Sequence, residues 1–188
     1  MRFKIILCLL LISLSTQSFA ADKYRIDPEH TFSSFEYDHW GLSKQRGRFD
    51  KTSGMIELDI QAGLGSIQIE IDSNSISTGS DTFNKVMRSS SFFESEEYPK
   101  ITFNSTKLFF AEGKLTQVEG NLKIKETTKT VTLEITHFGC RFVIPYLNQA
   151  CGANGQTKIL RSDFKIGRYV PFVSDEITLY ISVEGIKE

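Results

Sequence analysis

The sequence contains few of the residues that build metal centres and covalent active sites, because its 188 residues include only three histidines and three cysteines. His30, His39 and His137 show neither HExxH nor HxH spacing, so a zinc or copper site would require all three to meet from distant segments. No GxSxG nucleophile elbow is present, which leaves a serine hydrolase only as an arrangement of scattered residues. We expect neither a resident metal nor catalytic residues.

Neither sign of charge is in excess, and long apolar runs are confined to the start of the chain. With 22 basic and 23 acidic residues, the sequence has no basic stretch of the kind that nucleic-acid-binding proteins carry. After residue 20 no segment is apolar enough to span a membrane, which takes about 20 residues. We therefore expect no nucleic-acid partner, and no membrane span beyond residue 20.

Residues 1–20 are typical of a secretory signal peptide. Arg2 and Lys4 form a positive start, Ile5–Leu14 forms an apolar segment, and Ser18-Phe19-Ala20 forms a small-x-small cleavage site. A signal anchor is the alternative. We predict cleavage after Ala20, export to the periplasm, and a single domain of residues 21–188. This domain contains 20 basic and 23 acidic residues.

Two cysteines follow the leader, Cys140 and Cys151. In an oxidising compartment an even pair indicates a disulfide, whereas two cysteines without a histidine at metal spacing make a poor zinc site. We predict a disulfide that closes a short excursion containing Pro145 and stabilises the fold by about 3 kcal/mol in the chain-entropy model.

Alternation of apolar and polar residues predicts strands along most of the chain, most clearly at Ile67–Ile71 and Ile177–Val183. Gly47 and Gly54 lie inside extended segments, where backbones approach closely or a ladder bulges. The remaining strands are expected at 24–27, 31–40, 46–60, 100–110, 114–125, 130–138 and 156–164, with turns at 61–65 and 152–155.

Only residues 81–90 predict a helix. Ser80 or Asp81 supplies the cap, and Phe83, Val86 and Met87 recur at helical spacing. About eight strands with one short helix indicate an all-β domain, either an antiparallel barrel or a sandwich.

Aromatic residues are abundant after residue 20, with 13 Phe, six Tyr and one Trp. An eight-stranded barrel is either filled by its own side chains or holds one slender ligand, and composition alone favours the filled core. Arg88, just before Phe92 and Phe93, either caps the helix carbonyls or guards an apolar mouth and meets an anionic or carbonyl head group. Because neighbouring side chains on a turn diverge, only one of the two phenylalanines need face a cavity.

Eight motifs occur in one order along the chain: Tyr24–His30, His39-Trp40-Gly41, Arg46–Phe49 with Ser53-Gly54, Ile76–Gly79, Met87–Ser89, Phe92-Phe93, Tyr98–Phe103 and Arg161–Phe164. This order resembles the YceI-like family of exported, polyisoprenoid-binding proteins over essentially all of residues 21–188. The resemblance implies a lipocalin-like antiparallel barrel whose interior holds a long isoprenoid tail, as of a quinone or polyprenyl phosphate. It also implies no catalytic residues, and a dimer in many members.

Two segments depart from the family pattern. Members commonly carry an Arg-Asp-x-His run before Leu-Arg-Ser, but this chain has Phe83-Asn84-Lys85-Val86 with Met87 in place of the leucine. The acidic and histidine groups of that run are therefore missing, and a head-group preference is not carried over from relatives. The excursion between Cys140 and Cys151 is also unusual for the family.

These observations predict a periplasmic binding protein for a long apolar isoprenoid ligand, serving transport, storage or stress protection. We expect a homodimer that makes transient contact with the inner membrane. The alternatives are an interaction module for a membrane redox partner without a physiological ligand, and an enzyme that uses His39 or Arg88 on such a lipid. The expected ligand-binding residues are Phe35, His39, Met87, Arg88, Phe92, Phe93 and Phe103.

Overall fold

The computed structural model describes residues 21–188, so the predicted signal peptide lies outside the described residues. The described chain forms eleven strands, one α-helix and three short 3₁₀ segments. No helix in this part of the chain is long and apolar enough to cross a membrane. The strands are β1 (Asp22–Ile26), β2 (Phe32–His39), β3 (Ser43–Phe49), β4 (Thr52–Asp59), β5 (Leu64–Asp72), β6 (Ile76–Ser77), β7 (Lys100–Ala111), β8 (Lys114–Ile124), β9 (Thr127–Val143), β10 (Asn148–Leu160) and β11 (Glu176–Lys187); the helix is α1 (Asp81–Arg88), and the 3₁₀ segments are Ser73–Ser75, Ile144–Tyr146 and Arg161–Phe164.

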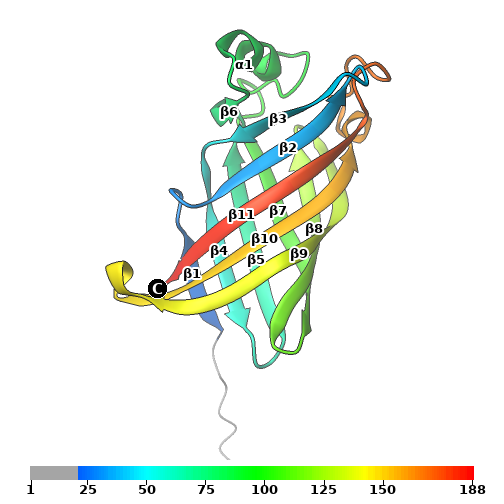
Figure 1. Ribbon diagram of the computed structural model, residues 1–188. Coiled ribbons are helices and arrows are strands. Elements are labelled where there is room, and N and C mark those ends of the chain that lie inside the picture. The colour runs from blue at the N-terminus through cyan, green and yellow to red at the C-terminus, as the bar shows by residue number, and fades with distance from the viewer. Residues whose placement is uncertain (1–20) are drawn as a thin grey trace, which may run out of the picture.

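Eight of the strands close into an antiparallel barrel in the order β1-β4-β5-β7-β8-β9-β10-β11, as Figure 1 shows. The last strand returns to the first, with Tyr24 of β1 opposite Lys187 of β11. The predicted all-β barrel of about eight strands with one short helix is therefore confirmed.

Along one edge, β11 pairs with two different strands. β11 pairs with β1 at Gly185–Lys187 and with β2 at Thr178–Ser182. Pro28 lies between β1 and β2, where its fixed φ and missing N–H interrupt pairing. Past this break, β2 and β3 form a hairpin that extends the sheet beyond the closed barrel, and the two-residue β6 pairs with the far side of β3.

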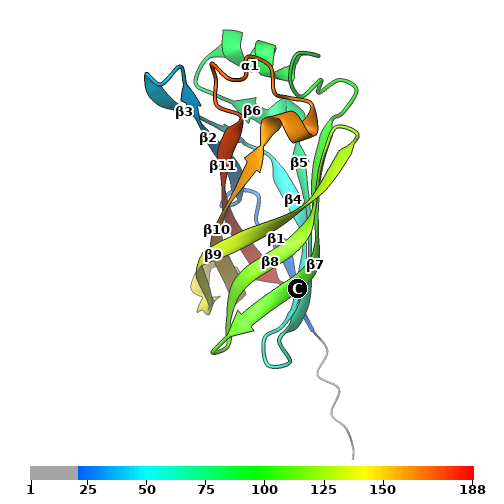
Figure 2. The same ribbon diagram turned by 90° about the vertical axis from the view of Figure 1, so that its right-hand side faces the viewer.

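Helix α1 lies across one end of the barrel (Figures 1 and 2). Its first turn is capped by Ser80, whose Oγ accepts a hydrogen bond from the Phe83 amide at 3.3 Å. Asn84 Oδ1 accepts hydrogen bonds of 2.8 Å from both the amide and the hydroxyl of Thr78. Asn84, which lies in the segment that differs from the family pattern, therefore fixes the helix to the preceding loop. The helix ends at Arg88, two residues before the predicted boundary.

The segment around the cysteines differs from the prediction. Cys140 and Cys151 are directly opposite each other in the β9–β10 ladder and form the predicted disulfide, which is confirmed. The predicted turn at 152–155 is wrong, because these residues belong to β10. Gly155 instead follows a register shift of the ladder, and a Cβ there would lie 3.2 Å from Ile135 Cδ1. Close packing and a bulge, rather than a reversal, account for the glycine.

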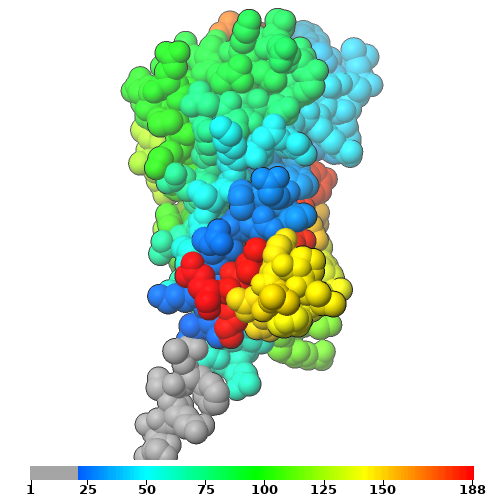
Figure 3. Space-filling view, turned by 90° about the vertical axis from the view of Figure 1, so that its left-hand side faces the viewer, coloured from blue at the N-terminus to red at the C-terminus, as the bar shows by residue number. Residues whose placement is uncertain are grey.

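The two long strands continue beyond the disulfide as a protruding hairpin. Its end, residues 141–149, holds the 3₁₀ segment Ile144–Tyr146 and is called here the hairpin tip. Figure 3 shows the tip in yellow against the blue link between β1 and β2 and the red end of β11. The predicted strand at 156–164 also ends early, since β10 stops at Leu160 and a 3₁₀ segment follows.

Candidate ligand-binding cavity

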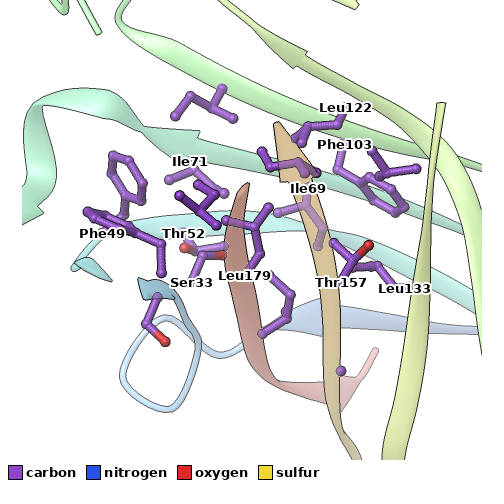
Figure 4. Close-up of a pocket in the computed structure, with 18 of the residues that line it drawn as sticks. Ser33, Phe49, Thr52, Ile69, Ile71, Phe103, Leu122, Leu133, Thr157 and Leu179 are labelled. Atoms are coloured by element: carbon purple, nitrogen blue, oxygen red, sulfur yellow. The ribbon is translucent and has the colours of Figure 1, made fainter. Parts of the chain in front are cut away.

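The barrel encloses a cavity of about 400 Å³, lined mainly by apolar side chains (Figure 4). The filled core that composition alone favours is therefore wrong. Nine apolar side chains that border the cavity are only half-buried, as expected beside a hollow: Ile56, Ile67, Ile69, Val131, Leu133, Ile135, Leu179, Ile181 and Val183.

Strand alternation produces this lining. On β5, Ile67, Ile69 and Ile71 all border the cavity, while Gln68 on the opposite face is exposed. Ile177, Leu179, Ile181 and Val183 of β11 follow the same rule. The two strands with the clearest alternation in the sequence thus contribute their apolar faces to the cavity.

Two glycines allow aromatic rings to lie flat against the wall. A Cβ on Gly47 would come within 2.5 Å of Cζ of Phe35, its partner across the β2–β3 ladder. A Cβ on Gly120 would come equally close to Cζ of Phe103. Gly54 is also required for close approach, since its φ is +155° and a Cβ would lie 2.1 Å from Gln68 O. The expected close approach of backbones is found at Gly54, whereas at Gly47 the close neighbour is the Phe35 ring and the ladder has no bulge.

Six of the seven predicted ligand-binding residues line the cavity, and their contact with a ligand stays a prediction. Phe35, Met87, Phe92, Phe93 and Phe103 are all buried, whereas His39 is exposed. Both phenylalanines after the helix border the cavity, although only one need do so.

Arg88 is the seventh, and it is not among the residues that line the cavity. Phe83 and Met87, four residues apart, share the helix face that does line it. Arg88 follows one position later, about 100° around the helix, and therefore points elsewhere. Its carbonyl accepts a hydrogen bond from the Ser95 amide at 2.9 Å, which ties the end of α1 to the next loop.

Two other arginines, both from the segment between β10 and β11, border the cavity in place of Arg88. Arg161 is only 7% exposed and donates four hydrogen bonds to backbone carbonyls, those of Ser174 (2.8 Å), Ile166 (3.0 Å), Val173 (3.0 Å) and Arg168 (3.2 Å). Burial lowers the pKa of the Arg161 guanidinium, and Asp175 and Tyr37 oppose that shift. Arg161 therefore holds the segment 161–175, called here the mouth loop, in one conformation.

The cavity opens at the end where the mouth loop meets the β2–β3 hairpin. Of the described residues that line it, only His39, Trp40, Arg168 and Tyr169 are exposed, and all four lie there. The indole of Trp40 stacks on Phe172 with ring centroids 4.7 Å apart. We call this end the mouth.

Polar side chains are sparse inside the cavity. Thr52 lines the wall with only 4% of its surface exposed, and its Oγ1 has no hydrogen-bond partner among the described residues. Nearer the mouth, burial raises the pKa of the Tyr37 hydroxyl, an effect that Arg161 partly offsets. The charged side chains that line the cavity, Arg161 and Arg168, both come from the mouth loop.

The three histidines do not come together. His39 lies at the mouth, His137 is exposed on β9, and His30 lies beside Asp27. Asp27, His30 and Glu184 form a cluster whose candidate ligand atoms lie within 4.8 Å of one another. Asp27 already accepts hydrogen bonds from the His30 ring, the Tyr146 hydroxyl and the Glu29 amide, so its oxygens are engaged within the protein.

The sequence offered little sign of the mouth. Trp40 and Arg161 fall within the family motifs, but neither carried a predicted role. Arg168 and Tyr169 lie in a stretch with no apolar period, so only the fold brings them to the cavity.

Comparison with known proteins identifies relatives along nearly the whole chain. A family model described as the YceI-like domain matches residues 24–185. Protein YceI of Salmonella arizonae is 33% identical over 177 residues, which cover 93% of this chain and 92% of that protein.

Solved structures agree with this assignment. BcnA of Burkholderia cenocepacia superposes with a TM-score of 0.71 at 25% identity, covering 85% of this chain and 98% of that chain. The YceI protein of Campylobacter jejuni gives 0.68 at 25% identity, with 80% and 90% covered. A polyisoprenoid-binding domain from Saccharophagus degradans shares the fold, with a TM-score of 0.65 at 17% identity over 88% of this chain and 98% of that one. The chain belongs to the YceI-like family.

Proposed function

We propose that this protein binds a long apolar isoprenoid lipid, a quinone or a polyprenyl lipid, inside its barrel, and that it carries, stores or protects this lipid in the periplasm. The observation that carries the proposal is the cavity of about 400 Å³ with half-buried apolar walls. Its volume falls in the range of about 300–1,000 Å³ found for ligand sites. The polyisoprenoid-binding domain from Saccharophagus degradans, which has the same fold, adds support.

The character of the wall favours a hydrocarbon chain as the enclosed part of the ligand. Each methylene transferred from water to such a wall contributes about 0.8 kcal/mol, so a chain of many prenyl carbons gains a large free energy. A polar group at the same depth would lose its hydrogen bonds to water and find few replacements. Tyr37, His39 and Arg168 line the cavity near its open end, so we place the head group at the mouth and the tail inside.

The test is native mass spectrometry of the mature protein purified from its own host, followed by identification of the extracted lipid. A folded Ile69→Trp variant should lose most of the bound lipid, because the indole projects into the cavity from β5. Gln68→Trp, which adds the same side chain to the outer face of that strand, is the matched control and should retain it. Circular dichroism checks that both variants fold.

Each outcome separates one function from another. Wild-type protein without lipid, or full occupancy in folded Ile69→Trp, would contradict the proposal. An absence of lipid in wild type would favour an interaction module for a membrane redox partner. Chemical conversion of the extracted lipid by wild type, lost in His39→Ala, would indicate an enzyme.

A further inference from the structure

We propose that the mouth docks on the surface of an anionic lipid bilayer through exposed aromatic and aliphatic side chains. This inference rests on the proposed function, because it concerns how a lipid would enter and leave the cavity. The surface, called here the mouth face, consists of five residues with their exposed fractions: Trp40 (53%), Leu42 (83%), Tyr169 (52%), Val170 (37%) and Phe172 (58%).

The mouth face is one unit although it comes from two separate loops. Trp40 stacks on Phe172, and the Trp40 amide donates a 2.9 Å hydrogen bond to the Phe172 carbonyl. His39 forms a bridge with Val173. On the other side, the Tyr169 ring lies 6.4 Å from that of Phe92, in the loop after α1. The fold therefore fixes these side chains next to one another.

The loop that carries three of the five residues is held rigidly. Arg161 donates to four carbonyls of the mouth loop, as described above. At its base, the Ser162 amide and hydroxyl donate to the Asp175 carboxylate at 2.8 and 2.6 Å. These bonds keep the apolar side chains exposed, although folding inward would remove them from water. Contiguous exposed apolar surface of this kind marks an interaction site.

The mouth face is continuous with the cavity. Trp40 and Tyr169 both line the cavity and are about half exposed to solvent. If this face rests on a bilayer, a lipid tail passes between membrane and cavity while staying in contact with apolar side chains. Transfer through water would expose the whole tail, at a cost that grows with each methylene. A bilayer is therefore the occupant that fits the position of this surface.

Arg168 supplies an exposed positive charge at the mouth for anionic head groups. Arg168 has no carboxylate within 4.0 Å among the described residues, and its guanidinium contacts Ser91 and the Tyr169 ring. Asp38 accepts a hydrogen bond from the Gly41 amide at 2.7 Å, and Asp175 accepts from Ser162. Because these donors are neutral, both carboxylates keep their negative charge. Tryptophan, tyrosine and arginine together are the residues enriched where proteins meet lipid head groups.

A second exposed apolar cluster lies on the hairpin tip, and it supplies a control. Phe142, Ile144 and Leu147 are 64%, 76% and 78% exposed. None of the three lines the cavity. Figure 1 shows the tip at the lower left and the mouth loop at the upper right, toward opposite ends of the barrel. Exposure alone would favour the hairpin tip as the membrane-docking surface, whereas continuity with the cavity favours the mouth face.

The sequence contains its own probe for the test, because Trp40 is the only tryptophan. The mature protein is mixed with vesicles of phosphatidylethanolamine and phosphatidylglycerol, and with vesicles of phosphatidylcholine alone. We expect the emission of Trp40 to shift to shorter wavelength and to be quenched by brominated acyl chains, more strongly with the anionic vesicles and less at high salt. Wild-type emission unaffected by either vesicle would overturn the proposal.

Co-sedimentation with the anionic vesicles then compares two double variants. Leu42→Ser with Phe172→Ser removes mouth-face residues that do not line the cavity, and should weaken vesicle binding about tenfold or more. Phe142→Ser with Leu147→Ser removes similar apolar surface from the hairpin tip and should bind as wild type does. The reverse ranking would assign the membrane contact to the tip and overturn the proposal.

Native mass spectrometry of the same proteins keeps the two proposals apart. The mouth-face variant should retain its bound lipid while losing vesicle binding. Bound lipid in a wild-type protein that ignores vesicles would contradict docking only. Vesicle binding by a wild-type protein that never holds lipid would contradict the proposed cargo only.

Discussion

The hydroxyl of Tyr146 donates a 2.8 Å hydrogen bond to Oδ2 of Asp27, which joins the hairpin tip to the link between β1 and β2. The two residues are 119 positions apart in the sequence. Nδ1 of His30 lies 2.8 Å from the same oxygen, and the Glu29 amide donates to the other carboxylate oxygen at 3.0 Å. One buried carboxylate thus anchors the protruding hairpin to the barrel.

This anchor should make stability depend on pH at both ends of the range. Burial favours the neutral form of Asp27, but the hydrogen bonds from His30 and Tyr146 outweigh it and lower the pKa of the carboxyl. The hydrogen bond between His30 and Asp27 also raises the pKa of His30 above its ordinary 6.5. Asp27 therefore contributes stability above its unfolded-state pKa near 3.8, and this is lost as the pH falls through the folded-state value. His30 contributes stability below pH 6.5, and this stability is lost as the pH rises through the folded-state pKa of His30.

Urea unfolding at a series of pH values tests this linkage. Wild-type stability should decline above pH 6.5 more than that of His30→Gln, which lacks the titrating group. An NMR titration of the His30 ring should give a pKa above the ordinary value. Parallel profiles for the two proteins above pH 6.5 would show that the contact contributes nothing.

Gly47→Ala should destabilise the barrel by about 1–3 kcal/mol and reduce bound lipid, because the new methyl group would push the Phe35 ring into the cavity. Gly152→Ala is the control, since a Cβ there would meet its nearest neighbours at an ordinary 3.6 Å. Unfolding free energies from urea titrations provide the comparison. Equal stability of the two variants would mean that Phe35 moves aside at no cost.

Arg161→Met should lower the unfolding free energy by about 3–5 kcal/mol, because it leaves carbonyls of the mouth loop without donors. Arg161→Lys should restore little, since an ammonium has three donors and no planar fork. Arg168→Met, at an exposed position, should change stability by less than about 1 kcal/mol. Amide exchange of residues 166–174 should speed up in Arg161→Met alone. Protection there equal to that of wild type would refute the role given to Arg161.

The disulfide should stabilise the β9–β10 hairpin without being essential for the fold. Cys140 and Cys151 are already opposite each other in the ladder, so reduction leaves the strands paired. We expect the double Cys→Ala variant to lose at most about 3 kcal/mol, the loop-closure contribution for a separation of 11 residues. The purified mature protein should have a mass two hydrogens below that of the dithiol. Alkylation of both cysteines before reduction would show that the bond does not form.

The homodimer stays a prediction, and light scattering tests it. The mature protein should give twice the monomer mass at micromolar concentration and above. The two surface variants used with vesicles should be measured in the same run, so that a change of assembly is not mistaken for a change of membrane binding. A monomer mass at every concentration would rule the homodimer out.

The strands were predictable where one face is buried and the other faces solvent, as at Ile67–Ile71. Such a position makes apolar and polar residues alternate with a period of two. The helix was predictable from its cap at Ser80. Arg161 was not, since an arginine beside serine and aspartate has the composition of a surface turn, and its burial depends on carbonyls of a loop that has no period. The cavity itself was not predictable either, because composition does not distinguish inward side chains that fill a barrel from those that border a hollow.

The pairing of β1 with β11 has a consequence for how the chain folds. The barrel closes only after residues 185–187 reach residues 24–26, so its last seam joins segments separated by nearly the whole described chain. Contacts of such long sequence separation form late, because they require the largest loss of chain entropy. A chain cut short before β11 would leave a sheet with two open edges and its cavity-lining surface in water, a state prone to aggregation rather than a smaller barrel.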